Sequence, residues 1–358
     1  MCIRDRKNMD AEKLSQLTQK VIGDAAGAVG LLLAYIGDQS KVYTTMDELG
    51  PSSVKEIADK AGLDERYLRE FLSSNAANGY VTYEPAEDKF SLSPEQAAVF
   101  AKDGEPTCLQ GYFQAIVGQY AEHEKAVETF QSGKGRPWGE HHLCCFCGTD
   151  RFFRPGYVGN LVSNWIPSLS GVEDQLKAGA KVADIGCGLG STTIIMAQTY
   201  PNSTIHGYDF HGPSIEEASA RAKELGLTNI EFHVSDARDI PDNGYDFACI
   251  FDALHDMGDP VGVANHIKNV LSDEGTFMLV EPAAADNLED NLNTFGGLAY
   301  GFSTIVCVPT SRAQDVGLCL GAQAGPKRLT EVLNSAGFNH VRESARTGTN
   351  MVFEVKQA

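Results

Sequence analysis

The sequence has no excess of basic residues: its 358 residues include 29 lysines and arginines against 48 aspartates and glutamates, a formal net charge of −19. Because nucleic acids and anionic membranes attract basic surfaces, we expect neither as a partner. No unbroken apolar run reaches the roughly 18 residues that indicate a membrane span. The opening segment MCIRDRKNMDAEKL also lacks the apolar core of a secretory signal. We interpret residues 1–8 as non-native, with Met9 as the true start, and leave them out of the fold prediction.

The nine cysteines are an odd number without a disulfide framework. In a chain without a signal segment, this usage predicts reduced thiols and a cytoplasmic protein. Three of the cysteines lie in HHLCCFCGTD, residues 141–150, where Cys144 and Cys147 form a C-x-x-C pair. A closed zinc site usually needs a second ligand pair from a distant segment, and a thioredoxin-like pair needs its own βαβ fold. The sequence offers neither, so we predict no metal site.

From about residue 170 onward, short β-branched or apolar runs alternate with helical segments. These runs are at 181–186, 203–210, 230–236, 245–254 and 275–282. The alternation predicts a parallel sheet covered by helices on both faces. Two later runs, 340–346 and 350–356, lie too close together for a helical crossover, so we predict an antiparallel hairpin at one end of the sheet.

The N-terminal part predicts a helix over about residues 10–37, followed by a helix, a turn at Gly62, a second helix and a short hairpin. This is a winged-helix pattern. In a DNA-binding version, lysines and arginines would line the second helix and the hairpin. Here Arg66 and Arg69 are outnumbered by neighbouring acids, and the hairpin tip at 84–89 is acidic. We therefore expect no DNA binding, and a homodimer formed through the first helix.

We predict three parts: a winged-helix dimerisation domain over 9–105, a helical connector over 106–170 that contributes to the active site, and an α/β domain over 171–358. About 40 residues, 283–326, separate the fifth strand of that domain from the next helix. Structureless loops of that length are uncommon and usually functional. We interpret this segment as a partly helical insertion that covers the active site.

The segment VADIGCGLGSTTIIMA combines a strand end, a glycine-rich turn and the start of a helix. Its glycines allow a ligand to approach the backbone closely. Asp184 precedes the turn, Asp209 ends the second strand, and Asp236 ends the third. Asp209 is placed to accept hydrogen bonds from two ribose hydroxyls. These acids would repel a pyrophosphate and favour a cationic aminoacyl sulfonium.

DIGCGLG, with acids ending the second and third strands, resembles the class I S-adenosylmethionine-dependent methyltransferases, and residues 10–356 are similar to bacterial methyltransferases with a winged-helix domain ahead. The resemblance implies a Rossmann-like seven-stranded sheet with its last strand antiparallel, and S-adenosyl-L-methionine as cofactor of the domain at 171–358. It also implies that the backbone around Gly186 and Gly188 holds the methionine moiety. The cofactor-binding candidates are Asp184, Gly186, Cys187, Gly188, Gly190, Asp209 for the ribose, Phe210, Asp236 and Ala237 for the adenine, Phe251 and Asp252.

The segment FDALHDMGDP closes the fourth strand. Plant-type O-methyltransferases carry a similar hydrophobic–His–Asp segment here, and their histidine is the general base. By position, this resemblance makes His255 the candidate base, with Asp252 near the cofactor. Glu281, at the end of the fifth strand, is a second carboxylate that we expect to orient His255 or contact substrate. A histidine titrates near neutrality and can take the proton of an alcohol or phenol. Met257 and Gly258 follow where the plant enzymes usually have tryptophan, which leaves the substrate class open.

Candidates for binding the methyl acceptor come from the connector, the fourth strand and the insertion: Trp138, His141, His142, Phe146, Tyr157, Asp256, Asn291 and Tyr300. The connector aromatics are equally consistent with packed core. We therefore predict methyl transfer to a small-molecule substrate, by O-methylation with His255 as general base. Two alternatives stay open: S-methylation of a thiol, or a metalloid, with residues 141–147 near the acceptor, and a cofactor-sensing winged-helix regulator.

Overall fold

The computed structural model describes residues 9–241 and 244–357. The chain divides into two compact units, of which the first ends at Val117 and the second begins at Gly118. The predicted connector at 106–170 therefore falls mostly within the second unit. The interpretation of residues 1–8 as non-native concerns residues outside the described part of the chain.

The first unit has the winged-helix order that the sequence predicts. Its elements are α1 (Ala11–Gln39), α2 (Val42–Leu49), α3 (Val54–Ala61), α4 (Glu65–Ala77), β1 (Thr82–Glu84), β2 (Lys89–Ser91) and α5 (Pro94–Phe100). A capping box between Ser53 and Glu56 starts α3, and Gly62 ends it in the left-handed conformation with φ of 70°. Strands β1 and β2 pair antiparallel as the wing.

The arginines of helix α4 are already paired with acids. Arg66 lies 2.6 Å from Glu70 on the same helix, and Arg69 donates two hydrogen bonds, of 2.7 and 2.8 Å, to Asp88 of the wing. A helix that reads DNA needs its basic groups free for phosphates and base edges. The pairing supports the expectation that this winged helix does not read DNA.

Helix α1 is long and apolar. It meets the length and composition of a membrane-crossing helix, with a mean hydropathy of 1.5 in the most apolar window, of which 17% is buried. A single such helix near an N-terminus is weak evidence for a span. Its exposed apolar side chains are Leu14, Leu17, Val21, Ile22, Val29, Leu32 and Ile36.

The second unit begins with helical segments that lead to a sheet. These are the end of α6 (Gln110–Ala121), α7 (His123–Ser132), a 3-10 turn at Trp138–Glu140, α8 (Leu143–Asn160), a π-helical and a 3-10 turn at Leu161–Trp165 and Ile166–Ser168, and α9 (Val172–Ala178). The sheet strands are β3 (Lys181–Ile185), β4 (Thr204–Asp209), β5 (Ile230–Val234), β6 (Tyr245–Phe251), β7 (Leu271–Pro282), β8 (His340–Arg346) and β9 (Asn350–Lys356). Each predicted strand is present. Strand β7 begins earlier than predicted because Leu271 pairs with Tyr245 across an irregular register.

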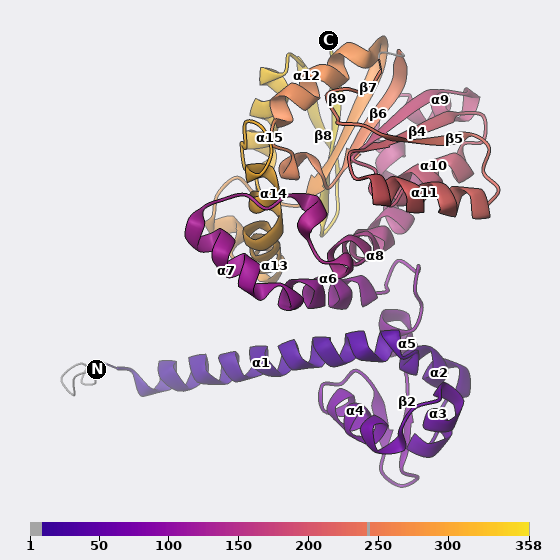
Figure 1. Ribbon diagram of the computed structural model, residues 1–358, viewed down its shortest axis with the longest axis vertical. Coiled ribbons are helices and arrows are strands. Elements are labelled where there is room, and N and C mark those ends of the chain that lie inside the picture. The colour runs from indigo at the N-terminus through magenta and orange to yellow at the C-terminus, as the bar shows by residue number, and fades with distance from the viewer. Residues whose placement is uncertain (1–8, 242–243, 358) are drawn as a thin grey trace. The chain divides into compact units, whose positions relative to one another are not determined.

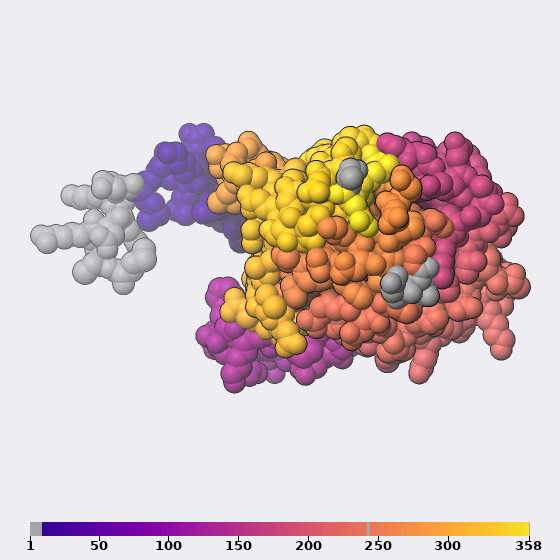
Figure 2. Space-filling model, turned by 90° about the horizontal axis from the view of Figure 1, so that it is seen from above, coloured from indigo at the N-terminus to yellow at the C-terminus, as the bar shows by residue number. Residues whose placement is uncertain are grey.

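The seven strands form one sheet in the order β5-β4-β3-β6-β7-β9-β8 (Figure 1). The pairings from β5 to β7 are parallel, and β9 is antiparallel to both β7 and β8. This confirms the predicted Rossmann-like sheet with an antiparallel hairpin at one end. The yellow C-terminal residues lie at the surface in Figure 2, in keeping with the largely exposed edge strand β8.

Helices cover both faces of the sheet. Helices α10 (Ser191–Thr199) and α11 (Gly212–Glu224) lie on one side, and α12 (Pro260–Val270) and α15 (Gly325–Ser335) on the other (Figure 1). One buried cluster joins Ile185 to Ile267 and Leu333, and a second joins Val182 to Met196. Alternate residues of β3 thus point to opposite faces, as a strand requires.

The predicted insertion is partly helical. It contains a 3-10 turn at Glu289–Asn291, α13 (Thr294–Phe302), a π-helical turn at Ser303–Cys307 and α14 (Val308–Arg312). Asn291 holds the start of this segment, since its Oδ1 accepts from the backbone of Ala285 at 2.8 Å and its Nδ2 donates back to Ala285 at 2.9 Å. Because the insertion follows β7 directly, it is anchored at the carboxyl end of the sheet.

Candidate active site

A glycine-rich turn joins β3 to α10. The backbone N–H groups of Gly186 and Cys187 donate to the carbonyl oxygen of Tyr208, at 2.7 and 3.0 Å. Gly190 has a φ of 79°, and a Cβ there would lie 2.7 Å from the ring of Phe232. This position therefore needs glycine for both backbone conformation and space.

Asp209 ends β4 beside this turn. Its Oδ2 accepts from the N–H of Gly188 at 2.9 Å, and its Oδ1 accepts from the N–H of His211 at 2.8 Å. Burial raises the pKa of Asp209, and these two donors act against that rise. The carboxylate is thus fixed at the carboxyl edge of the sheet, where ligands bind in open α/β folds.

Asp184 lies behind the turn and does not line the pocket. It is fully buried, and its Oδ2 accepts from the hydroxyls of Thr192 and Thr193, both at 2.7 Å. Burial raises its pKa to about 6, opposed by the two threonine hydrogen bonds. Its observed role is to tie β3 to the first turn of α10.

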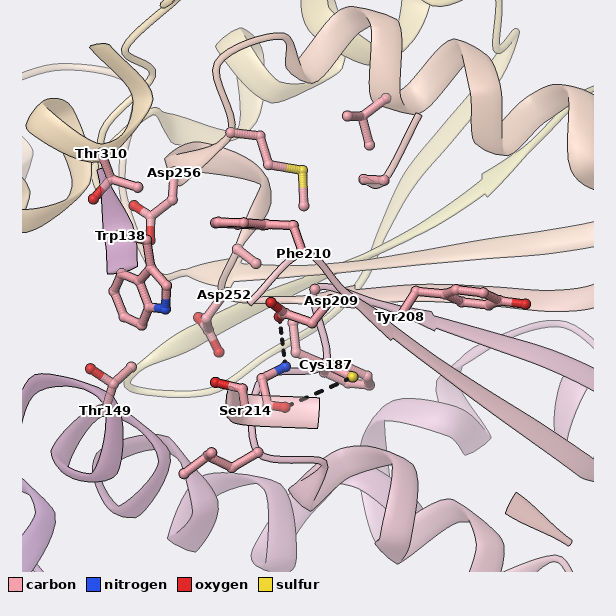
Figure 3. A pocket seen from close by; sticks show the side chains of 18 of the residues that line it. Trp138, Thr149, Cys187, Tyr208, Asp209, Phe210, Ser214, Asp252, Asp256 and Thr310 are labelled. Carbon is pink, nitrogen blue, oxygen red and sulfur yellow. Dashed lines mark hydrogen bonds between the residues drawn. The ribbon is translucent and has the colours of Figure 1, made fainter. Parts of the chain in front are cut away.

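A pocket opens at the carboxyl ends of β3, β4, β5 and β6 (Figure 3). Its described lining includes seven aspartates and a single arginine, Arg238. The aspartates are Asp150, Asp209, Asp236, Asp252, Asp256, Asp259 and Asp315. This excess of acidic groups gives the pocket a field that favours a cationic ligand.

The pocket wall beyond Asp209 is formed by residues that follow β4 and β5. Phe210 is 55% exposed, and Asp236 and Ala237 line the pocket beside it. Burial acts to raise the pKa of Asp236, but hydrogen bonds from the side chain and backbone of Arg238 hold it below its ordinary value. A flat aromatic side chain and a fixed carboxylate can receive a planar base that carries an amino group.

Asp252 follows β6 and lies between Trp138 and Asp209 on the pocket wall (Figure 3). It has a φ of 50°. Its oxygens accept from the hydroxyl of Tyr157 and from Nδ2 of Asn350, both at 2.8 Å. Burial raises the pKa of Asp252 to about 8, and the nearby carboxylate of Glu281 adds to that rise. A bound cation would reverse this effect, because it favours the ionised form.

His255 lies between two carboxylates and is buried, with 3% of its surface exposed. Its Nδ1 is 2.5 Å from Oε2 of Glu281, and its Nε2 is 3.3 Å from Oδ1 of Asp256. Burial alone would lower the pKa of His255, but Glu281 and Asp256 raise it well above its ordinary value. Asp256 lines the pocket, whereas His255 and Glu281 lie behind it. The two carboxylates and the imidazolium between them therefore form one array with Asp256 as its exposed end.

Two buried oxygen atoms near this array have no hydrogen-bond partner within the described residues. They are Oδ1 of Asp256 and Oγ1 of Thr310, which comes from helix α14 of the insertion. Both residues line the pocket, and Figure 3 shows them grouped with Trp138 on the side away from Asp209. Because an unpaired buried polar atom is unfavourable, this end of the pocket is prepared for a polar ligand group.

The segment 141–147 reaches the pocket through one side chain, Phe146, which packs edge-on against Trp138 at 5.3 Å. His141 is buried behind Trp138, with ring centroids 5.9 Å apart, and burial lowers its pKa to about 4. His142 is exposed and caps helix α8, its Nδ1 accepting from the N–H of Cys144 at 3.1 Å. The cysteines of this segment are absent from the described lining of the pocket.

The structure brings most of the predicted site residues together. Those on the pocket wall are Gly186, Cys187, Gly188, Asp209, Phe210, Asp236, Ala237, Phe251, Asp252, Trp138, Phe146, Tyr157 and Asp256. Asn291 is a structural residue of the insertion, and Tyr300 lines a separate cavity. Lining residues that were not predicted from the sequence include Thr149, Asp150, Ser191, Ser214, Arg238, Met257, Asp259, Thr310, Gln314 and Asp315. For Met257 and Asp259 a signal existed, because they belong to the quoted FDALHDMGDP segment.

Comparison with known proteins gives two family matches. Residues 176–337 match a methyltransferase domain, and residues 27–102 match an Rv2258c-like winged HTH domain. Both agree with the resemblance derived from the sequence. Among curated relatives, a ubiquinone/menaquinone biosynthesis C-methyltransferase of Bdellovibrio bacteriovorus is 30% identical over 128 residues, covering 35% of this chain and 52% of the relative. The chain spans about half or less of the length of the first curated relatives that it matches.

Similar solved structures cover nearly the whole chain. Human N-acetylserotonin methyltransferase in complex with S-adenosylmethionine has a TM-score of 0.72 at 13% identity, covering 98% of this chain and 99% of that one. The mitomycin 7-O-methyltransferase MmcR has a TM-score of 0.70 at 16% identity, covering 98% and 100%. At these identities the likeness establishes the fold.

Proposed function

We propose that this chain, which carries a methyltransferase domain behind an N-terminal winged-helix domain, transfers the methyl group of S-adenosyl-L-methionine to an oxygen atom of a small-molecule acceptor. The observation that carries the proposal is the pocket at the carboxyl edge of the sheet. Asp209 makes one end of it fixed and acidic, and the other end is lined by Asp256, which is ion-paired with His255, and by Thr310. One end suits a cationic nucleoside, and the other suits a polar acceptor group.

The residues of the first end fit the cofactor. Asp209 is fixed by two backbone donors with its carboxylate at the pocket edge, where it can accept from ribose hydroxyls. The turn at Gly186 and Gly188 leaves the backbone accessible, and a Cβ on Gly188 would meet nothing within 4 Å. Asp236 and Ala237 bound the adenine position. When bound, S-adenosyl-L-methionine supplies a methyl group on a positively charged sulfur, which the acidic lining favours.

The second end holds the acceptor and receives its proton. A hydroxyl placed between Thr310 and Asp256 donates to the carboxylate of Asp256 and orients one lone pair toward Asp252, near which the methyl group would lie. Methyl transfer needs no acid for its leaving group, but a hydroxyl nucleophile needs a base. The sequence analysis assigned that base to His255. In the array, the carboxylate of Asp256 accepts the proton, and the imidazolium of His255, held by Glu281, orients that carboxylate through its 3.3 Å ion pair.

A thiol acceptor is the second candidate. An ordinary thiol has a pKa near 8.5 and is partly ionised at neutral pH, so it depends less on a base. The array of Asp256, His255 and Glu281 would then be superfluous, which favours the oxygen acceptor.

The alternative of a winged-helix regulator receives no support from α4, whose two arginines are paired with acids.

We further propose a cytoplasmic homodimer that forms through helix α1. Seven large apolar side chains on this helix are more than about a third exposed, and exposed apolar patches mark interaction sites. Light scattering of the intact protein should give twice the mass of one chain, 38.6 kDa. A Val21→Asp exchange should shift that mass toward the monomer, and an unchanged monomeric mass in the native chain would contradict the proposal.

The function is tested by incubating the purified chain with methyl-labelled S-adenosyl-L-methionine and a metabolite extract, followed by mass spectrometry of labelled products. We expect a small molecule labelled on oxygen. Label on carbon, nitrogen or sulfur would refute the oxygen assignment while keeping the methyltransferase. Absence of S-adenosyl-L-methionine binding by calorimetry would refute the function as a whole.

A further inference from the structure

A cluster outside the pocket joins three metal-binding side chains on the edge strand β5 and its neighbour β4. They are His206 of β4 and Glu231 and His233 of β5, and their ligand atoms all lie within 4.8 Å of one another. The parallel register pairs His206 with Glu231, and His233 follows two residues later on the same face. Two adjacent strands therefore present all three groups to one side of the sheet.

The distances within the cluster match a coordination site. Nδ1 of His206 lies 3.2 Å from Nε2 of His233, and Oε2 of Glu231 lies 3.8 and 3.7 Å from those two nitrogens. The centre of this triangle is about 2.1 Å from each of the three atoms, which is the length of a Zn²⁺–nitrogen or Zn²⁺–carboxylate bond. An ion fits there without movement of the strands.

The surroundings hold the ligands but leave the centre reachable. The ring of His233 stacks on Tyr208 with centroids 4.8 Å apart and an interplanar angle of 21°, and His206 stacks on His233 at 5.5 Å. The side chains of Glu231 and His233 are 65% and 37% exposed, so solvent can supply a further ligand. Lys181 lies on the same face, with its ammonium 5.6 Å from the ring centroid of Tyr245. The charge of Glu231 offsets that cation.

We propose that His206, Glu231 and His233 bind one late first-row divalent metal ion, with Zn²⁺, Co²⁺ or Ni²⁺ as suitable probes. Two imidazoles and one carboxylate select these ions over Mg²⁺ and Ca²⁺, which prefer oxygen ligands. The ion fastens the edge strand β5 to β4. These strands end at Asp209 and lead to Asp236, so the metal braces the cofactor end of the pocket without touching it.

The competing interpretation is a simple hydrogen bond between the two imidazoles. A second possible ligand set, His255, Asp256 and Cys307, also brings its atoms within 4.8 Å. Two of its members, His255 and Asp256, already belong to the proposed proton-accepting array, in which Glu281 and Asp256 face the two ring nitrogens of His255. Co²⁺ binding distinguishes the proposed metal site from a simple hydrogen bond, and a Cys307 variant distinguishes it from metal binding at the second ligand set.

The experiment uses the untagged full-length protein, stripped of metal by a chelator and titrated with Co²⁺ while its visible absorption is recorded. We expect a single site with a d–d spectrum typical of nitrogen and oxygen ligands, displaced by Zn²⁺. His233→Ala and Glu231→Gln should each weaken binding by about tenfold or more. The Glu231 side chain is largely exposed and that of His233 is partly exposed, so these variants should fold, and circular dichroism checks that they do.

Two matched variants serve as controls. His340→Ala removes an exposed histidine from β8, the opposite edge strand, and should leave Co²⁺ binding unchanged. Cys307→Ser should also leave it unchanged. Zn²⁺ should raise the melting temperature of the native chain and not that of His233→Ala, because a ligand stabilises only the state that binds it. Absence of Co²⁺ binding, or binding lost with Cys307→Ser but kept with His233→Ala, would overturn the proposal.

Discussion

The two ends of the pocket differ in how their polar groups are satisfied. At the cofactor end, Asp209 accepts two backbone hydrogen bonds and Asp236 is paired with Arg238. At the proposed acceptor end, Oγ1 of Thr310 is buried and has no hydrogen-bond partner among the described residues, and Oδ1 of Asp256 has an ion pair with His255 at 3.3 Å but no hydrogen bond. The polar groups of the first end are satisfied within the protein, and we propose that the acceptor completes the second end.

The difference follows from how each end is built. The cofactor end uses the ends of adjacent strands and one short turn, whose geometry is fixed by the sheet. The acceptor end combines the turn after β6, the connector helix α8 and the insertion helix α14, which lie far apart in the sequence. We therefore propose that the end built from the sheet binds the cofactor, and that the separate segments of the other end set the choice of acceptor.

Removal of the proton-accepting array should have the largest effect. Asp256→Asn and His255→Gln should each lower turnover by about 100- to 10,000-fold, because a positioned base contributes a factor of that size. The measurement is the single-turnover rate with labelled cofactor and the identified acceptor. Affinity for S-adenosyl-L-methionine should change less than about threefold. Full turnover in both variants would refute the array as the base.

A side chain at Gly190 should be the next most damaging change. Gly190→Ala places a Cβ 2.7 Å from Phe232 and 2.9 Å from Ala218 at a φ of 79°. Strain and overpacking of this kind lower the free energy of unfolding by about 2–4 kcal/mol. Urea unfolding measures the loss. Gly212→Ala, where a Cβ meets nothing within 4 Å, is the control and should be nearly neutral.

The ionisation of Asp252 should make cofactor affinity depend on pH. Its pKa is raised to about 8, chiefly by burial and next by Glu281, with Tyr157, His255 and Asn350 acting against the rise. A cationic ligand binds the ionised form, so affinity for S-adenosyl-L-methionine should increase by about tenfold from pH 7 to pH 9 and then level off. S-adenosyl-L-homocysteine, which lacks the sulfonium, should show a weaker dependence. Calorimetry with Asp252→Asn should give a flat profile, and a pH dependence preserved in this variant would exclude Asp252 as its source.

A change at Thr310 should have the smallest effect. Thr310→Val keeps the shape and removes the unpaired hydroxyl, so the KM for the acceptor should rise by about fivefold, the value of one hydrogen bond of about 1 kcal/mol. Cofactor affinity should stay the same. An unchanged KM would mean that the hydroxyl does not contact the acceptor.

The sheet could be predicted because its strands are apolar runs separated by helical segments and end in recognisable acids. The turn at 186–190 could also be predicted, because its glycines are a recognisable motif. At Gly190, glycine is required by the positive φ and by the closeness of Phe232. Asp184 shows the limit of such reasoning. From the sequence, Asp184 lies two residues before the first glycine, at the end of the strand, and was predicted to bind the cofactor. In the structure, its carboxylate accepts hydrogen bonds from Thr192 and Thr193 instead.

The acceptor end was harder to predict because its residues come from distant segments without local signals. Thr310 lies in the five-residue helix α14, VPTSR, which carries no motif that indicates a ligand site. Tyr300 and Asn291, from the same insertion, were predicted to contact the acceptor but lie elsewhere. The dense cysteine segment also contributes Phe146 rather than a thiol to the pocket wall. Only the tertiary packing decides which side chains of such segments face the ligand.

The most direct test of the account is a paired measurement on Asp209→Asn and Asp256→Asn, with equilibrium binding of S-adenosyl-L-methionine and the single-turnover rate at saturating cofactor recorded for both. We predict that Asp209→Asn weakens binding by about tenfold or more, the effect of losing a charged hydrogen-bond acceptor, and leaves the rate nearly unchanged. Asp256→Asn should do the opposite. If Asp256→Asn weakened cofactor binding as much as Asp209→Asn and left the rate intact, the division of the pocket into a cofactor end and an acceptor end would be contradicted.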